Sequence, residues 1–257
     1  MIFLKIFMPM LTAHTIKILQ SLDKKKFRQK YNLFLVEGDK IIRELKNSSY
    51  KVQEIFSTDI SNPDFQSFKT NLITERELRK ISLLQNPKNS VAVCELRENT
   101  SIEAPIQLVL DNVQDPGNLG TIIRIADWFG IKHIFCSMDT ADCWNPKVVQ
   151  ATMGSIARVT MHYLDLGRLI DLLPKSYPIY GTLLDGNDIY AEKLSAAGLI
   201  VMGNEGNGIS AAIRERINRR LLIPNFSTEA THAESLNVAI ATAIVCSEFR
   251  RRGTVEP

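Results

Sequence analysis

The sequence is poor in cysteine and has no cysteine pair of the kind that binds zinc. Its 257 residues include only four cysteines, and no two of them are spaced as C-x-x-C. No histidines stand at ligand spacing beside them, so a zinc site is not expected. Isolated cysteines in predicted strands and helices indicate buried thiols in a reducing compartment. These residues are Cys94, Cys136, Cys143 and Cys246.

Long hydrophobic runs are also missing. The first eleven residues, MIFLKIFMPML, are apolar, but they are too few to span a bilayer. They also lack the leading positive charge and the small-residue cleavage site of a signal peptide. Met8 and Met10 leave open a later start of translation. We expect a cytoplasmic protein that does not associate with a membrane.

The composition excludes disordered, collagen-like and coiled-coil proteins. Hydrophobic residues make up 45% and charged residues 23%, as in ordinary globular domains. The net charge is only +3, yet residues 1–100 hold 17 Lys and Arg against 11 Asp and Glu. A basic cluster of this kind attracts phosphate backbones, although a solvated helix face has the same composition. The cluster comprises Lys24, Lys25, Lys26, Arg28 and Lys30.

Two regions of the chain differ in their pattern. The first alternates short elements, with helices expected over 15–22, 40–46 and 75–81 and strands over 33–36, 52–57 and 90–94. The stretch RENTSIEAP, residues 97–105, is polar and ends in proline, which is typical of a linker. We therefore expect two domains, residues 1–100 and 101–257.

The second region has the alternation of an α/β fold. Continuous apolar runs predict strands buried on both faces of a parallel sheet, at 106–110, 133–136, 179–184, 199–202 and 220–223. Helices are expected between them, at 119–129, 146–155, 166–173, 210–216 and 235–252. This order indicates a parallel sheet with helices on both faces.

Three segments that follow predicted strand ends carry the chemical signal, because ligand sites of open α/β sheets gather there. The first, LDNVQDPGNLGTIIRIADWFGI at 110–131, has Asn112 at a strand end and Asn118 as the expected helix cap. Gly130 fits the end of that helix. Arg124 falls off the apolar face of the helix and is free to reach a ligand or solvent. That face contains Leu119, Ile122, Ile123 and Ala126.

The second segment, LIVMGNEGNGIS at 199–210, runs from a strand into a glycine-rich turn, where the backbone can pass close to a ligand. Its glycines do not have the dinucleotide spacing G-x-G-x-x-G, and it lacks the Lys-Ser/Thr of a phosphate loop. Glu205 within the turn would repel phosphates. The segment therefore favours a ligand with a positive centre or with hydroxyl groups, although a turn without a ligand remains an alternative.

The third segment, LLIPNFSTEATHAESLNVAIATAIVCSEFRRR at 221–252, runs from a strand through a polar loop into a long helix. Ser235 is the expected N-cap of that helix. Ala239, Ala241 and Ala243 allow close packing against another segment. The three arginines at 250–252 suit the negative end of the helix dipole.

Taken together and in this order, the three segments resemble the motifs of the SpoU/TrmH branch of the SPOUT methyltransferases. The likeness covers about residues 106–250, and residues 34–44 and 82–96 resemble the RNA-binding domain that often precedes this catalytic domain. The resemblance implies a deep trefoil knot, a homodimer with the site near its interface, and S-adenosylmethionine as methyl donor. It implies methylation of a ribose 2′-hydroxyl in ribosomal or transfer RNA.

The resemblance also assigns roles by position. It places catalytic residues at Arg124, Asn112, Glu205, Ser235 and Asn237. It places cofactor-binding residues at Leu183, Met202, Gly203, Asn204, Gly206, Ile223, Ser235, Leu236 and Asn237. The loop between Pro224 and Ser235 is longer than in many relatives, which bears on cofactor closure or substrate choice.

The expected reaction is an in-line attack of a ribose oxygen on a sulfonium methyl group, so the protein mainly aligns and deprotonates. Two roles remain open for Arg124. It acts as the base, or it stabilises the forming alkoxide and fixes the adjacent phosphate while another group or water takes the proton. We favour the second role, because a guanidinium holds its proton to above about pH 12.

Three rival functions are weighed against this one. An RNA-binding protein of the same fold without the reaction is disfavoured because all the polar motif residues are present. A nucleotide-binding oxidoreductase is disfavoured by the glycine spacing and by Glu205. Base methylation, as in other SPOUT branches, stays open.

Overall fold

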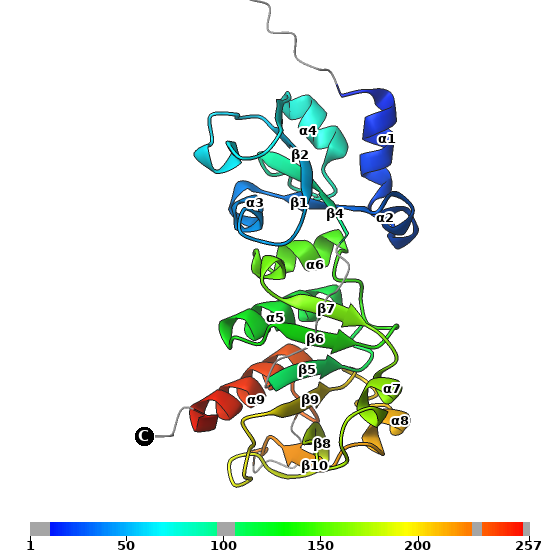
Figure 1. Ribbon diagram of the computed structural model, residues 1–257, viewed down its shortest axis with the longest axis vertical. Coiled ribbons are helices and arrows are strands. Elements are labelled where there is room, and N and C mark those ends of the chain that lie inside the picture. The colour runs from blue at the N-terminus through cyan, green and yellow to red at the C-terminus, as the bar shows by residue number, and fades with distance from the viewer. Residues whose placement is uncertain (1–10, 97–105, 228–232, 254–257) are drawn as a thin grey trace, which may run out of the picture. The chain divides into compact units, whose positions relative to one another are not determined.

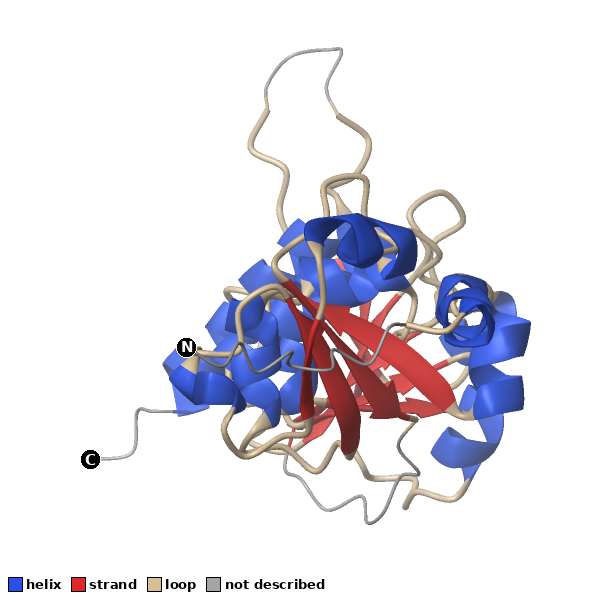
Figure 2. Cartoon of the chain, turned by 90° about the horizontal axis from the view of Figure 1, so that it is seen from above, coloured by secondary structure: helices blue, strands red, loops and turns tan. Residues whose placement is uncertain are grey.

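The computed structural model describes residues 11–96, 106–227 and 233–253, and divides the chain into two compact units. The first comprises Met1–Glu98 together with Trp144–Ala157, and the second comprises Asn99–Cys143 and Arg158–Pro257. The linker predicted at 97–105 lies outside the described residues. Figure 2 shows the strands in red with helices in blue around them.

The first unit is built on a four-stranded sheet in the order β1-β4-β2-β3. The β4 strand pairs antiparallel with β1 and β2, and β3 pairs parallel with β2. The strands are β1 (Leu33–Glu37), β2 (Val52–Ser57), β3 (Thr70–Leu72) and β4 (Ser90–Glu95). The helices that precede or connect them are α1 (Ala13–Ser21), α2 (Lys25–Tyr31), α3 (Asp39–Leu45), the 3-10 turn η1 (Pro63–Phe65) and α4 (Glu75–Ile81).

Side chains alternate along each strand and so point to both faces of this sheet, and each face is covered by a hydrophobic cluster. Phe34 and Val36 of β1 pack with α3 in one hydrophobic cluster, and Leu35 packs with α1 and α4 in the other. The first cluster also takes in Val149 and Ile156, from α6 (Pro146–Ala151) and η2 (Ser155–Ala157). Sequence reasoning leaves this segment in the second domain, but its apolar side chains complete the core of the first unit.

The helix predicted over 146–155 ends early, at Ala151. Met153 and Gly154 both have positive φ, and the chain then forms η2. A Cβ at Gly154 would lie 2.6 Å from Cγ of Glu44 on α3, so only glycine allows this close approach.

The second unit is built on a six-stranded sheet in the order β10-β8-β9-β5-β6-β7 (Figure 1). Every pair is parallel, which confirms the predicted fold class. The strands are β5 (Ile106–Leu110), β6 (His133–Cys136), β7 (Thr160–Tyr163), β8 (Ile179–Asp188), β9 (Gly198–Met202) and β10 (Arg219–Leu222). The helices are α5 (Pro116–Trp128), α7 (Leu166–Asp171), α8 (Ala211–Arg214) and α9 (Val238–Gly253).

Helices cover both faces of this sheet. Val109 and Val201 pack with α7 and α8 in one cluster, and their strand neighbours Leu108 and Ile200 are buried toward the opposite face. That opposite face carries α5 and α9 (Figure 1). Because β5 and β9 are buried on both faces, they appear in the sequence as unbroken apolar runs.

The pairing of β8 with β10 is interrupted by a bulge. Gly181 pairs with Arg220, but the next partner of β10 is Asn187, so residues 182–186 leave the ladder. We call these residues the β8 bulge. Gly186 closes it, since a Cβ there would lie 2.4 Å from the Leu221 carbonyl carbon.

Gly186→Ala is therefore expected to separate β8 from β10 and to lower the thermal midpoint by several degrees, because overpacking against backbone costs about 1–3 kcal/mol. Thermal unfolding measured by circular dichroism tests this. Gly206→Ala is the control, since its Cβ would meet nothing closer than 3.6 Å. Equal midpoints for the two variants would show that the close approach at Gly186 is unimportant.

Candidate active site

Parallel pairing brings the three motif segments to one edge of the sheet. The β5 and β9 strands are neighbours, and β8 lies between β9 and β10 in the sheet. The loops after β5, β9 and β10 therefore share the carboxyl edge. Asp111, buried at the end of β5, accepts a hydrogen bond from the Ser210 amide at 2.7 Å. The carbonyl of Asn112 accepts from Nδ2 of Asn204 at 2.8 Å. The first two segments are thus bound directly to each other.

The glycine-rich turn after β9 is organised by the side chain of Asn204. Its Oδ1 accepts from the amides of Gly206 at 2.9 Å and Asn207 at 3.0 Å, and its backbone pairs with Gly208 in both directions. A Cβ at Gly203 would lie 2.3 Å from the Gly208 carbonyl carbon, so the turn closes only with glycine at that position. The side chain of Asn204 thus stabilises the loop, and Glu205 lies exposed within the turn.

Asn118 joins all three motif segments. Its Nδ2 donates to Oε1 of Glu205 at 2.9 Å, and its Oδ1 accepts from Nδ2 of Asn237 at 2.9 Å. The prediction that Asn118 caps α5 is wrong, because Asp115 accepts from the Asn118 amide at 2.8 Å and is the cap. Sequence reasoning missed this residue as a site candidate. Asp before proline is a standard cap-and-first-turn pattern, and recognising it would have left Asn118 available for another role.

The long C-terminal helix begins later than predicted. Asn237, not Ser235, is the cap, since its Oδ1 accepts from the amides of Ala239 at 2.9 Å and Ile240 at 3.3 Å. The helix therefore starts at Val238, and Ser235 lies exposed in the loop before it. Asn237 thus both starts α9 and contacts Asn118.

Helices α5 and α9 run in the same direction and are held together at both ends. The bond between Asn118 and Asn237 joins their N-terminal ends. At the other end Nε of Arg250 donates to the carbonyl of Phe129 at 2.6 Å. The sequence assigned Arg250 only a favourable position in the helix dipole. The N-terminal ends of both helices therefore meet beside the Glu205 side chain.

Arg124 lies on α5, six residues after Asn118. The predicted apolar face of the helix is confirmed, because Leu119, Ile122, Ile123 and Ala126 are all buried. Arg124 is exposed, and no described residue forms a hydrogen bond or ion pair with it. Six residues along a helix span about 9 Å and turn through about 240°, so Arg124 and Asn118 lie on different faces of α5.

The other predicted site residues differ in what they expose. Leu183 and Met202 are buried, the side chain of Leu183 packs with α7 and α8, and the carbonyl of Met202 accepts from the amide of Asp111 at 2.9 Å. Ile223, at the end of β10, is half-buried and Gly206 is exposed. Leu236 is 51% exposed.

The environment of Asn112 differs from that of Asn118. Asn112 adopts a left-handed conformation with φ of 61°, and its Oδ1 accepts from Gln114 at 3.1 Å. None of its three bonds to side chains of described residues involves Arg124. The loop predicted to influence closure, 225–234, is described only in part, because 228–232 lie outside the described residues.

Comparison with known proteins agrees with this arrangement. Residues 105–247 match the SpoU rRNA methylase family, and residues 13–92 match an MRM3-like substrate binding domain. The chain belongs to the SpoU rRNA methylase family.

Several individual proteins are similar over nearly the whole chain. A 23S rRNA (guanosine(2553)-2′-O)-methyltransferase of Bacillus subtilis (strain 168) is 33% identical, covering 91% of this chain and 95% of that protein. A TrmH-family protein of Porphyromonas gingivalis is 39% identical, with a TM-score of 0.85 and coverage of 95% and 99%. An rRNA methyltransferase of Sinorhizobium meliloti, solved with S-adenosylmethionine bound, is 28% identical, with a TM-score of 0.82 and coverage of 94% and 96%.

Proposed function

We propose that this protein transfers a methyl group from S-adenosylmethionine to a ribose 2′-hydroxyl of ribosomal RNA. The observation that carries the proposal is the hydrogen-bonded series Glu205–Asn118–Asn237, which joins the three motif segments at the start of α5, the helix that carries the exposed Arg124. The named activities of the relatives support the same reaction. Among them, guanosines of 23S rRNA are the recurring target, and we propose a guanosine for this chain as well.

The described residues suit the proposed cofactor. The turn after β9 leaves its glycine backbone uncovered, and its one charged side chain, Glu205, is an acid that suits a cationic sulfonium. When bound, S-adenosylmethionine supplies an activated methyl group. In this proposal Gly203, Asn204 and Gly206 offer backbone groups to it, as do Leu183, Met202 and Ile223. Ser235, Leu236 and Asn237 complete the pocket from the loop before α9.

In this mechanism the protein positions the ribose, and the proton of its 2′-hydroxyl passes to another group or to water. Arg124 stabilises the alkoxide that forms on the 2′-oxygen and binds the neighbouring phosphate, and a guanidinium fork suits both groups. Asn118 and Glu205 hold the N-terminal end of α5, and so set the direction of Arg124. Asn112 and Ser235 orient the ribose. The other role considered for Arg124, that of the base, predicts a different pH profile for the Arg124→Lys variant.

Product analysis tests the proposed reaction. The protein is incubated with ribosomal RNA and S-adenosylmethionine carrying a labelled methyl group, and the RNA is digested to nucleosides. We expect label in a 2′-O-methylated nucleoside. Label in a methylated base would show that the protein methylates a base and not a ribose. Binding of both substrates without transfer would favour a non-catalytic RNA-binding protein.

We also propose a homodimer and a trefoil knot. The dimer is supported by large apolar side chains exposed on and beside α5 and α9, namely Trp128 at 86%, Ile240 at 53% and Leu236 at 51%. Exposed patches of this kind mark protein interfaces. Membership of the family supports the knot. Among the described residues, none of the helices has the length and hydrophobicity needed to cross a bilayer. We propose that the protein acts in the cytoplasm.

The first unit is proposed to hold RNA through α2. Four of the five basic residues predicted to contact phosphate are exposed, and within the described chain none forms an ion pair with an acid. They are Lys24, Lys25, Lys26 and Lys30. The fifth, Arg28, is buried, and its Nη1 donates to the carbonyls of Leu22 at 2.6 Å and Asp23 at 2.8 Å. Arg28 therefore has a structural role and is removed from the residues proposed to contact phosphate.

Salt dependence tests the lysines of α2. Replacing Lys25, Lys26 and Lys30 with alanine is expected to weaken RNA binding and to lower the slope of log K against log salt by about 0.7 for each phosphate that is no longer neutralised. Filter binding at several salt concentrations measures this. A triple alanine variant of Lys132, Lys175 and Lys193 removes the same charge from the second unit. An equal effect of both variants would show that RNA binding depends on the total charge of the protein and that α2 is not a specific RNA-binding surface.

A further inference from the structure

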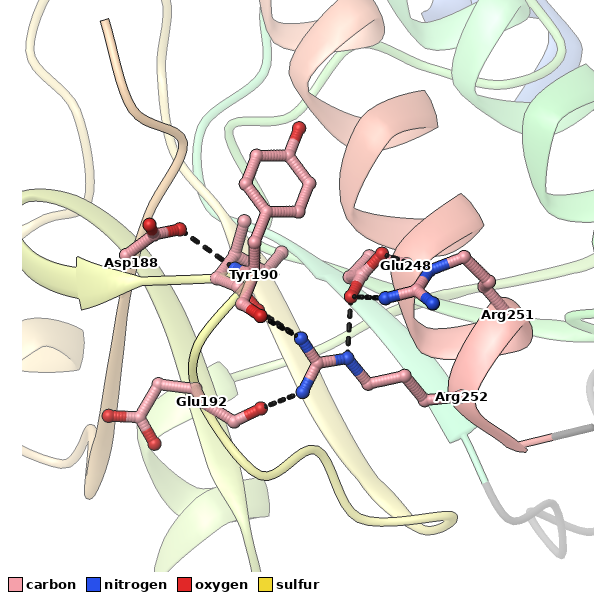
Figure 3. Close-up of polar contacts among 7 residues, drawn as sticks. Asp188, Tyr190, Glu192, Glu248, Arg251 and Arg252 are labelled. Carbon is pink, nitrogen blue, oxygen red and sulfur yellow. Dashed lines mark hydrogen bonds and ion pairs between the residues drawn. The ribbon is translucent and has the colours of Figure 1, made fainter. Parts of the chain in front are cut away.

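The C-terminal end of α9 carries an ion-pair cluster centred on Glu248 (Figure 3). The side chain of Glu248 is 5% exposed, and its carboxylate accepts from Nε and Nη2 of Arg251 at 2.8 and 2.7 Å. It also accepts from Nε of Arg252 at 2.5 Å. The bond from Arg251, with that from Arg252, lowers the pKa of Glu248 to about 2 against the opposing effect of burial. The carboxylate is therefore ionised throughout the neutral range.

The two arginines share this partner, and Arg252 also reaches a second segment of the chain. The remaining nitrogens of Arg252 turn away from α9 and donate to backbone carbonyls of the segment that follows β8 (Figure 3). Nη1 donates to the carbonyl of Glu192, and Nη2 donates to that of Tyr190 and, at 3.4 Å, to that of Ile189. A guanidinium has five N–H donors in a planar fork, which suits this bridging position.

The segment held by Arg252 leads directly to the proposed cofactor pocket. The amide of Ile189 donates to the carbonyl of Leu222 at 2.9 Å, and Asp188 pairs with Leu222 in the sheet. Ile223 is the next residue. On the other side, the same segment continues from the β8 bulge, which contains Leu183. A displacement of residues 189–192 is therefore passed through one hydrogen bond to the end of β10.

We propose that Arg252, oriented by Glu248, is a positioning residue that fixes the end of β10 and so the cofactor-binding backbone at Ile223. This inference rests on the proposed function. It assigns to the far end of α9 a role in the same pocket whose other wall is formed at the start of that helix by Asn237. Arg252 acts through the backbone of residues 189–192.

Replacing Arg252 with methionine, which keeps much of the apolar stem, is expected to raise KM for S-adenosylmethionine about tenfold with kcat nearly unchanged, because displaced binding groups lose affinity without touching the reacting atoms. Amide exchange measured by mass spectrometry is expected to rise in peptides covering 186–192 and 220–224. Arg252→Lys keeps the charge but not the fork, so its values should be intermediate.

Arg251→Met is the matched control, because it removes an equal charge from the same carboxylate and leaves the bonds from Arg252 to the carbonyls of residues 189–192 in place. It should leave both KM and exchange near the values of the unmodified protein. Unchanged exchange in Arg252→Met, or faster exchange with an unchanged KM, would overturn the positioning role, as would equal effects of the two arginine variants. If Arg252→Met does not fold, Arg252→Lys carries the comparison. Failure of the unmodified protein to bind S-adenosylmethionine would instead count against the proposed function, and exchange would still test the contact itself.

Discussion

Replacing Arg124 with alanine is expected to lower kcat for methyl transfer at least about 100-fold, the usual effect of removing one preorganised donor to a developing oxyanion. Arg124 is exposed on α5 and contributes nothing to the buried face of that helix. The fold should therefore survive the substitution. Transfer of labelled methyl groups to ribosomal RNA measures kcat, and calorimetry should give an unchanged affinity for S-adenosylmethionine.

Arg168→Ala is the control for loss of a surface charge. Its side chain is 87% exposed on α7 and forms a single ion pair with Asp165. Exposed ion pairs of this kind contribute little to the free energy of unfolding. Full activity in Arg124→Ala would remove both roles considered for this residue, and equal losses in the two arginine variants would assign the effect to charge in general.

The pH profile of Arg124→Lys separates the two roles. A lysine has an ordinary pKa of about 10.4 and loses its proton far more readily than arginine. If Arg124 is the base, the lysine variant should gain activity steeply as the pH rises toward about 10. If Arg124 stabilises the alkoxide, the variant should follow the pH profile of the unmodified enzyme at a lower rate, because the charge remains and the fork is lost.

Regular patterns predicted most of the fold. The runs at 106–110 and 133–136 coincide with β5 and β6, because buried parallel strands carry apolar residues on both faces. The short β3 and β7 strands and helix α2 were not predicted. The β3 strand has only three residues, and α2 is a seven-residue helix with four basic residues and no apolar face of its own.

The choice of helix caps depended on contacts distant in sequence. Asp115 and Asn118 are both good caps, as are Ser235 and Asn237, and local propensity does not separate them. Asn118 bonds to Glu205, 87 positions away, and to Asn237, 119 positions away. The pairing that defines the centre of the candidate site was therefore invisible to a reading of each motif alone, and so was the packing of 144–157 into the first unit.

Changing one partner of the Asn118–Glu205 bond should lower activity strongly, and exchanging both partners should restore it. Asn118→Asp alone is expected to lower kcat/KM at least about 100-fold, since it places two carboxylates where one bond of 2.9 Å now exists and displaces the N-terminal end of α5. Glu205→Gln alone should have a smaller effect, because the amide oxygen of glutamine still accepts from Asn118.

The double variant, Asn118→Asp with Glu205→Gln, reverses the direction of the bond. The amide of glutamine then donates to one oxygen of the new carboxylate, and the other oxygen still accepts from Asn237. Activity measured by methyl transfer should return to within about tenfold of Glu205→Gln, a coupling that a double-mutant cycle extracts. Asn118→Ala, which has no repulsion and no bond, should lie between the single aspartate variant and the double variant.

The pH dependence of the single variant supplies an independent check. Two carboxylates in contact raise the pKa of one of them, so Asn118→Asp should recover part of its activity as the pH is lowered and one proton is shared. The double variant carries one carboxylate and should show no such recovery. If it is as inactive as Asn118→Asp, the hydrogen bond between Asn118 and Glu205 does not organise the site, and the first two segments are held together by the bonds of the Asp111 and Asn204 side chains to backbone groups.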